Sequence, residues 1–301
     1  MKYYRLIAAT QSYLWGGKKL FGFGKNTDQD IIAESWELSF RPEGKTMVET
    51  KQGLKTLESV LSKEELGTNC EKYPFFPVLI KFIDACQDLS IQVHPSDEYA
   101  LKNEDSFGKT EMWYVIDAEE GAMLHIGFDK DYTKEEVAKH IKEGTLLSIM
   151  NHIPIHKGDC YFIPSGTLHA IGKGSLICEI QENSNLTYRV FDYNRVGKDG
   201  KPRELHIEKA IKVVEPIKYN ANSLRGHPLV DCSYFYVDHL TNATSLKADA
   251  KSFISLHIIS GSGSIEGEPF KTGDSFFIPA NQEVKLSGNY EAIICEANYS
   301  N

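Results

Sequence analysis

Four polar residues of this chain combine side-chain types and a spacing that suit a divalent-metal site. Gln92 and His94 are two residues apart in an apolar stretch, so on a β-strand both side chains project to one face while Val93 points to the other. Glu111 precedes the next apolar stretch, and His169 lies further along the chain. One amide oxygen, two imidazoles and one carboxylate are a workable set for Zn²⁺, and an open coordination position would make such a site catalytic.

Strands must position these residues, because short apolar and aromatic runs punctuated by Gly, Pro and Asn dominate the chain. The clearest runs are predicted as buried strands over residues 78–83, 89–93, 113–116 and 176–180. The sequence therefore predicts a mainly β protein.

Helical spacing is confined to three segments, residues 55–66, 133–144 and 209–214. The second has the strongest signals: Thr133 as N-cap, Glu136 three residues later to complete a capping box, and Gly144 as the stop. It interrupts the β pattern, so we expect a short helical insertion around residues 133–150.

One sequence pattern occurs twice. Residues 157–164 read KGDCYFIP and residues 272–279 read TGDSFFIP, at an offset of 273 − 158 = 115. Each copy describes a tight turn, a buried strand and a closing Pro, which indicates two copies of one β unit. At the same offset His169 corresponds to Val284, so we expect the second copy to be structural and without the metal site.

The pattern G-D-x-x-x-x-P-x-x-x-x-H that ends at His169 resembles the second motif of the cupins, which are small jelly-roll β barrels. Gln92, His94 and Glu111 resemble the first cupin motif, with Gln in place of its first His. The resemblance implies two cupin-type jelly-roll β barrels, which enclose cavities and leave no exposed edge. We expect a catalytic metal-binding domain over residues 1–222 and a second cupin-like domain without the ligands over residues 223–301, joined by a linker at 219–225.

Seven short segments in order make the resemblance more specific. Type I mannose-6-phosphate isomerases are zinc cupins with Q-x-H-P, K-x-E and H-A segments, and this chain resembles them at residues 92–95, 109–111 and 169–170. It is also similar to them at residues 15–17, 34–39, 80–85 and 188–193. The resemblance implies one Zn²⁺ per chain, bound by Gln92, His94, Glu111 and His169.

The same resemblance assigns roles around the metal. It implies that Arg189 is the active-site arginine and that Lys109 handles a proton or contacts the substrate. Asn185 stands where many members carry Asp; it can orient substrate hydroxyls but cannot act as a base. Ser90 shares the strand face of Gln92, so we expect it beside the substrate phosphate.

The implied reaction interconverts mannose 6-phosphate and fructose 6-phosphate by moving a proton between C2 and C1 through an enediol(ate). Zinc would act as a Lewis acid on the substrate oxygens. Arg189 cannot deprotonate, so it suits oxyanion or phosphate stabilisation. Either Lys109 or a zinc-bound hydroxide would shuttle the proton, and the sequence does not choose between them.

Composition limits the other function classes. The chain has 301 residues, is 41% hydrophobic and 25% charged, and carries a formal net charge of -9, which disfavours duplex nucleic acid as a partner. An anionic small molecule fits if basic groups gather locally; no obligate protein partner is evident. No apolar run approaches the ~18 residues of a membrane span, and six cysteines without a C-x-x-C pair favour buried, reduced thiols. We therefore expect a soluble, cytoplasmic protein.

Three alternatives remain open at this stage. An Fe(II) cupin oxygenase and a non-catalytic sugar-binding cupin are competing functions for the whole chain. The loop that contains Arg195, Lys198 and Lys201 is either solvated or part of a phosphate clamp. For the remaining histidines, among them His206 and His257, we expect ordinary structural or surface roles.

Overall fold

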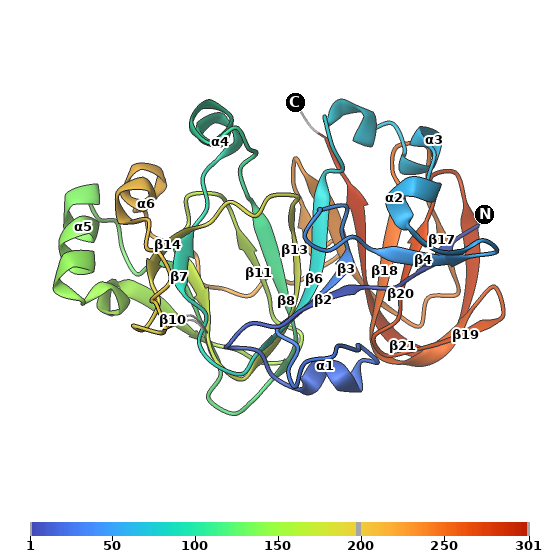
Figure 1. Ribbon diagram of the computed structural model, residues 1–301, viewed down its shortest axis with the longest axis horizontal. Helices are drawn as coiled ribbons and strands as arrows, with labels where there is room; N and C mark the ends of the chain where they lie inside the picture. Colours follow the sequence, from blue (N-terminus) through green and yellow to red (C-terminus); the bar gives the residue numbers. More distant parts are fainter. Residues whose placement is uncertain (1, 197–199, 300–301) are drawn as a thin grey trace. The chain divides into compact units, whose positions relative to one another are not determined.

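The computed structural model describes residues 2–196 and 200–299, and its regular structure is mainly β-strand, arranged in several sheets (Figure 1). Two compact units can be distinguished. Unit 1 contains the residues up to 12, residues 18–82 and the residues from 225 onwards; unit 2 contains residues 13–17 and 83–224. The boundary at 224/225 lies near the predicted 222/223, but most of residues 1–82 group with the C-terminal residues. The division into a catalytic and a second domain stays a prediction.

Unit 2 contains a five-stranded antiparallel sheet and a second group of adjacent strands. The sheet order is β10 (Met150–Pro154), β9 (Met123–Phe128), β12 (His169–Ile171), β7 (Ile91–Val93) and β14 (Tyr188–Phe191). The second group has the order β11 (Cys160–Ile163), β8 (Glu111–Ala118) and β13 (Ser175–Glu182). All the predicted buried strands of this unit are therefore present, although the residues at 89–90 precede β7.

Helices cover one face of the five-stranded sheet. Helix α5 (Lys134–Glu143), the 3-10 turn η2 (Leu146–Ile149) and α6 (Ile207–Val213) share a hydrophobic core with β7, β12 and β14 (Figure 1). As predicted, Thr133 and Glu136 form a capping box at the start of α5, and Gly144 is left-handed at its end. Successive side chains of a strand point to opposite faces, so the residues that alternate with these apolar ones project from the other face of the sheet.

The predicted helix over residues 55–66 is instead two short helices, α2 (Leu57–Val60) and α3 (Lys63–Leu66). Leu61 is extended, with ψ of 139°. Ser62 then caps α3 and forms a capping box with Glu65. The apolar spacing does not distinguish one helix from two, and the local cap of Ser62 decides the break.

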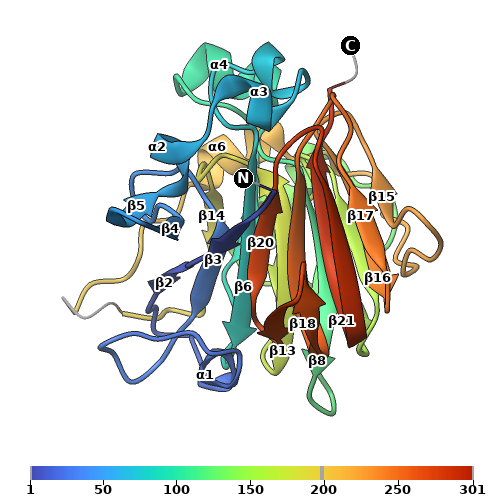
Figure 2. The same ribbon diagram turned by 90° about the vertical axis from the view of Figure 1, so that its right-hand side faces the viewer.

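Unit 1 contains a large antiparallel sheet (Figure 2). Its order is β1 (Tyr4–Leu6), β20 (Ser275–Ile278), β18 (Ile254–Ile265), β21 (Glu283–Ala297), β16 (Phe235–Thr241) and β15 (Val230–Asp231), with β17 (Ser245–Lys247) on β21 and β19 (Glu268–Lys271) on β18. The other elements of this part of the chain are α1 (Lys19–Gly22), β2 (Ala9–Gln11), β3 (Glu34–Leu38), β4 (Met47–Thr50), β5 (Gly53–Thr56), η1 (Cys70–Lys72) and β6 (Val78–Ala85), whose last residues belong to unit 2.

Strand pairs recur in the two units at the offset of the repeated sequence pattern. In unit 2, Ile163 pairs with Glu111 and His169 pairs with Gln92. In unit 1, the corresponding pairs join Ile278 to Ile254 and Val284 to Leu246. The places of the four proposed ligands Gln92, His94, Glu111 and His169 are thus taken by Leu246, Ala248, Ile254 and Val284. These four are apolar and belong to or pack on one hydrophobic core. In the second copy, apolar side chains therefore occupy the positions that polar side chains hold in the first.

Two further expectations are modified. All six cysteines are free thiols, but Cys86 is exposed and Cys232 is half-buried, while the other four are buried. In the predicted linker, Ser223 Oγ accepts a hydrogen bond from Cys160 N and Leu224 N donates to Cys160 O. That segment is therefore bound to strand β11. In the part of the chain that the structure describes, no helix has the length and apolar character needed to cross a membrane.

Candidate metal centre

One face of the five-stranded sheet carries three polar residues in a row. Gln92 in β7 pairs with His169 of β12 on one side and with Arg189 of β14 on the other. Residues directly opposite in an antiparallel ladder project to the same face. Their chain neighbours, such as Val93, lie in the core beneath the helices. The prediction that Gln92 and Val93 point to opposite faces is therefore confirmed.

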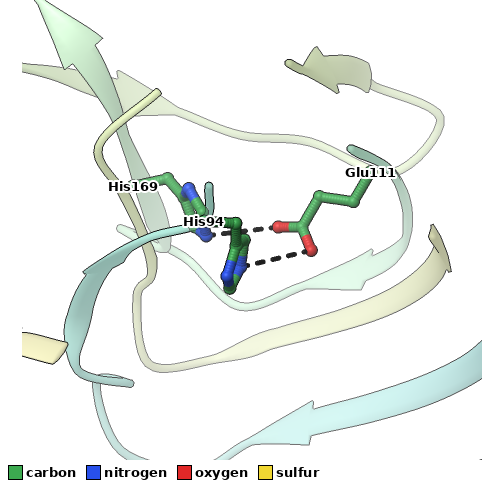
Figure 3. Close-up of side chains that lie close together, drawn as sticks. All are labelled: His94, Glu111 and His169. Atoms are coloured by element: carbon green, nitrogen blue, oxygen red, sulfur yellow. Dashed lines mark ion pairs between the residues drawn. The ribbon is translucent and has the colours of Figure 1, made fainter. Parts of the chain in front are cut away.

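The second strand group supplies a carboxylate to the same space. Glu111, the first residue of β8, is fully buried, and so is His169; His94, directly after β7, is 1% exposed. Glu111 Oε1 lies 3.2 Å from His169 Nε2, and Glu111 Oε2 lies 3.7 Å from His94 Nε2 (Figure 3). One donor atom from each of these three residues lies within 4.8 Å of the other two, which is close enough for one metal ion to contact all three.

In each of the two histidines, a hydrogen bond from Nδ1 to a backbone carbonyl fixes the direction in which Nε2 points. His94 Nδ1 lies 2.9 Å from Leu186 O, and His169 Nδ1 lies 2.8 Å from Thr167 O. A carbonyl only accepts, so each Nδ1 carries the proton and each Nε2 directs a lone pair towards Glu111. Metal-binding histidines are usually oriented by this kind of bond to a backbone carbonyl. The donor set therefore fits a divalent cation.

Burial keeps His169, one of the proposed ligands, neutral. Removal from solvent is the largest influence on His169 and lowers its pKa to about 4; the nearby Lys109 also lowers it. A neutral imidazole is the form that binds a metal, so His169 can act as a ligand throughout the neutral pH range.

Gln92 lies at the edge of this group. Its Nε2 is 3.4 Å from His169 Nε2, so in this arrangement the amide donates to the imidazole lone pair. The two ends of a carboxamide have nearly the same shape, and a half-turn brings Oε1 to the same place. Gln92 can thus offer an oxygen to a cation without any movement of the backbone.

Lys109 is buried beside the carboxylates. Its Nζ lies 2.7 Å from Glu111 Oε2 and 3.8 Å from Glu179 Oε1. Glu179 also accepts a hydrogen bond of 3.0 Å from Trp113 Nε1, and the Trp113 ring packs edge-on against His169 at 5.4 Å. Sequence reasoning missed Glu179. The available signal was a single acid inside the apolar run at 176–180.

A close backbone approach brings Lys109 and Glu111 to His94. A Cβ on Gly108 would lie 2.5 Å from the backbone of Ser96 and Asp97 and 2.6 Å from Pro95 O, closer than real Cβ contacts. With glycine there, Lys109 N donates to Pro95 O at 3.0 Å. This bond ties the Lys109–Glu111 segment to the chain directly after His94.

The two predicted substrate residues differ in their surroundings. Ser90 is 4% exposed, and its Oγ accepts a hydrogen bond of 3.3 Å from Arg189 Nε. Asn185 is exposed, and its backbone oxygen accepts a bond from Thr187 Oγ1. The structure therefore brings Ser90 to Arg189, whereas Asn185 lies at the protein surface.

Further arginines gather near Arg189. Asp192 accepts from Arg203 Nε at 2.7 Å and also pairs with Arg195. Burial, followed by the charge of Arg203, lowers the pKa of Arg189 from its usual value. In the predicted loop, Arg195 is therefore held by Asp192, Lys201 is exposed, and Lys198 lies outside the described residues. Sequence reasoning missed Arg203, because its contact with Asp192 depends on the return of the loop.

Comparisons with known proteins show which family the chain resembles. A family profile described as phosphomannose isomerase type I, catalytic domain, matches residues 3–135. The chain is 38% identical over 300 residues to mannose-6-phosphate isomerase ManA of Bacillus subtilis, which covers 93% of this chain and 94% of that protein. It is 34% identical over 302 residues to the mannose-6-phosphate isomerase of Streptococcus mutans, with 95% of each covered.

A solved structure gives the same result. The crystal structure of the mannose 6-phosphate isomerase from Bacillus subtilis matches with a TM-score of 0.88 at 33% identity, covering 98% of this chain and 99% of that one. Similarity of this extent in both sequence and fold, together with the buried His-Glu-His group, identifies this chain as a member of the type I phosphomannose isomerase family of enzymes.

Proposed function

We propose that this protein is a zinc-dependent aldose–ketose isomerase that interconverts mannose 6-phosphate and fructose 6-phosphate through an enediol(ate). The observation that carries the proposal is the convergence of His94, Glu111 and His169, all buried and within 4.8 Å of one another. The relatives of closely similar length are named for this activity, which supports the choice of substrate.

Gln92, His94, Glu111 and His169 would hold the metal. Two imidazoles with one amide and one carboxylate oxygen are a workable ligand set for Zn²⁺. When bound, the metal supplies Lewis-acid polarisation of the substrate oxygens. Residues of the chain would bind the substrate, stabilise its charge and transfer the proton.

Arg189 would stabilise negative charge on the substrate. It shares a sheet face with Gln92 and is permanently cationic, so it can face an oxygen on which charge develops without losing its own proton. Ser90 accepts from Arg189 Nε and would help to fix the guanidinium beside the substrate phosphate. Asn185, being exposed, would contact the sugar hydroxyls only once substrate is bound.

Lys109 would move the proton between C2 and C1. Its Nζ is within hydrogen-bonding distance of Glu111 and is shielded from solvent, so a bound sugar beside the ligands would be within its reach. Glu179, 3.8 Å away, would keep the ammonium in place between turnovers.

The finer architecture belongs to the same proposal. Two cupin-type jelly-roll barrels, the first catalytic and the second filled by apolar residues, account for the repeated strand register. The location we propose is the cytoplasm, and the substrate we propose is a small sugar phosphate.

A coupled assay of mannose 6-phosphate to fructose 6-phosphate tests the function. It is run on the protein as purified, after chelation, and after Zn²⁺ is returned, with the metal content measured each time. We expect activity that disappears with chelator and returns with zinc. No turnover at full zinc occupancy would exclude the isomerase. Turnover that requires O₂ and Fe²⁺ would instead support the oxygenase, and sugar binding without turnover the non-catalytic cupin.

A further inference from the structure

Arg189 lies on an exposed sheet edge. In the five-stranded sheet, β14 is the terminal strand, and β7 is its one strand partner among residues 2–196 and 200–299. The backbone groups of Arg189 point away from β7, because both make their bonds on the outer side, to His206. An edge strand has one side that no further strand holds, and a shift of β14 would move the guanidinium relative to Gln92.

His206 completes that edge as a neighbouring strand would. Its backbone N–H donates to Arg189 O at 2.7 Å, and its ring Nδ1 accepts from Arg189 N at 3.2 Å. His206 is also bound to the first turn of α6, where Ala210 N donates to His206 O at 2.9 Å. A side-chain nitrogen thus takes the place of the carbonyl that a partner strand would provide.

We propose that His206 is a positioning residue for Arg189: its neutral Nδ1 and its backbone N–H fix the arginine backbone at the metal-facing side of the sheet. This inference rests on the proposed function, in which Arg189 acts on the substrate. It assigns a specific task to a histidine whose sequence context indicated only an ordinary structural role.

The bond to Arg189 N requires an unprotonated Nδ1. Protonation converts this atom into a donor that faces another donor, which breaks the bond and repels the backbone. The charged groups around the ring are Arg189 on β14, Glu204 beside it, Lys209 on α6 and Glu104 after α4 (Asp97–Asn103). The Tyr188 ring lies 6.2 Å away and its hydroxyl donates to Glu104.

These surroundings keep His206 neutral near pH 7. Burial has the largest influence and lowers the pKa of His206 from its usual 6.5; Arg189 and Lys209 lower it further, whereas Glu204 and Glu104 raise it. Arg189 is therefore held in place at neutral pH and released as the pH falls through the pKa of this histidine.

Two substitutions of His206 separate hydrogen bonding from bulk. In His206→Asn, Oδ1 can occupy the place of Nδ1 and still accept from Arg189 N, but it does not titrate. In His206→Leu the acceptor is lost. We expect the Leu variant to lose about 10- to 100-fold in kcat, the range for a misplaced catalytic group, while its KM changes little and its zinc content stays at the wild-type level. The Asn variant should regain most of the wild-type kcat.

The pH dependence of kcat is a measurement that a purely structural role of His206 would leave unchanged. With zinc content held equal, we expect the acid limb of kcat to shift to lower pH in His206→Asn but not in the control His156→Asn, whose ring is 84% exposed. Identical acid limbs in wild type and His206→Asn would overturn the proposal. So would a folded, zinc-loaded His206→Leu with wild-type kcat.

A measurement without turnover keeps this inference distinct from the proposed function. In ¹⁵N NMR of the wild-type protein, His206 should be the tautomer with Nδ1 unprotonated, and the Arg189 amide signal should shift as His206 titrates. A protonated Nδ1 at pH 7 would contradict the inference even in an active enzyme. Absent isomerase activity with the expected NMR titration would refute the function and leave the Arg189–His206 bond established.

Discussion

Arg189 lies directly opposite Gln92 in the ladder between β14 and β7, on the face that looks away from the helices. A permanently charged guanidinium therefore stands beside a proposed metal ligand without being a ligand itself. We expect Arg189→Met to keep its zinc while kcat falls about 10²- to 10³-fold, the loss typical when one group that stabilises developing charge is removed. Zinc content and steady-state kinetics check this, with Arg41→Met as control, since the half-buried Arg41 pairs with Glu43 and has no place in the proposed site. Loss of zinc from Arg189→Met would contradict the assignment.

Glu111→Gln tests the metal-binding group. The variant keeps the shape of the side chain but removes its negative charge, and we expect zinc affinity to fall by more than about 100-fold, since even a residue that only orients a ligand contributes 10- to 100-fold. Competition with a chromophoric chelator measures the affinity. Glu120→Gln, in the exposed turn after β8, should bind zinc as the wild type does. Equal affinities in the two variants would remove Glu111 from the ligand set.

Lys109→Met tests the proton shuttle. Methionine fills a similar volume but has no proton to exchange, so we expect turnover to fall by about 10²- to 10⁴-fold, the contribution of a positioned acid or base. Exchange of the C2 proton of mannose 6-phosphate with solvent, followed by NMR, should fall equally. Lys102→Met, exposed on α4, is the matched control. Near-normal turnover in Lys109→Met would eliminate this lysine as the shuttle.

Gly108→Ala tests the close backbone approach that brings Lys109 to the proposed ligands. The added Cβ would lie 2.5 Å from backbone atoms, so the backbone would have to shift, and we expect a loss of about 1–3 kcal/mol in the free energy of unfolding and weaker zinc binding. Urea unfolding and metal competition measure the two effects. Gly22→Ala, where an added Cβ meets nothing within 4 Å, should change neither. An unaltered stability in Gly108→Ala would argue against the contact with residues 95–97.

Glu182 should make the protein less stable as the pH rises. Burial, followed by the charge of Asp97, raises the pKa of Glu182 to about 8, against 4.5 for the model carboxyl. Between these values the folded protein keeps a proton that the unfolded chain releases, so the contribution to stability is complete below about pH 4.5 and is lost towards pH 8.

Glu182→Gln should remove this dependence. The amide can still accept from Thr110 N, as Glu182 Oε2 does at 2.5 Å, and can donate to Asp97 as the protonated acid does. We expect the free energy of unfolding of the wild type to fall, relative to the variant, by on the order of 3 kcal/mol between pH 5 and pH 8. Parallel pH profiles in urea unfolding would show that Glu182 is ionised in the folded protein.

The sequence by itself determined those features that depend on neighbours along the chain. Alternation along a strand placed Gln92 and Val93 on opposite faces, the capping box of Thr133 and Glu136 started α5, and the repeated G-D pattern gave the register in which Val284 replaces His169. Each of these follows from local geometry or from a matched pattern, so no knowledge of distant contacts was needed.

The tertiary structure alone decided which distant groups meet. The contact of Glu179 with Lys109, the pairing of Arg203 with Asp192 and the support of Arg189 by His206 were not foreseen. These depend on strands and loops far apart in sequence that come together only when the sheets form. A polar residue in a sequence has many potential partners, and burial selects one by excluding water from the others.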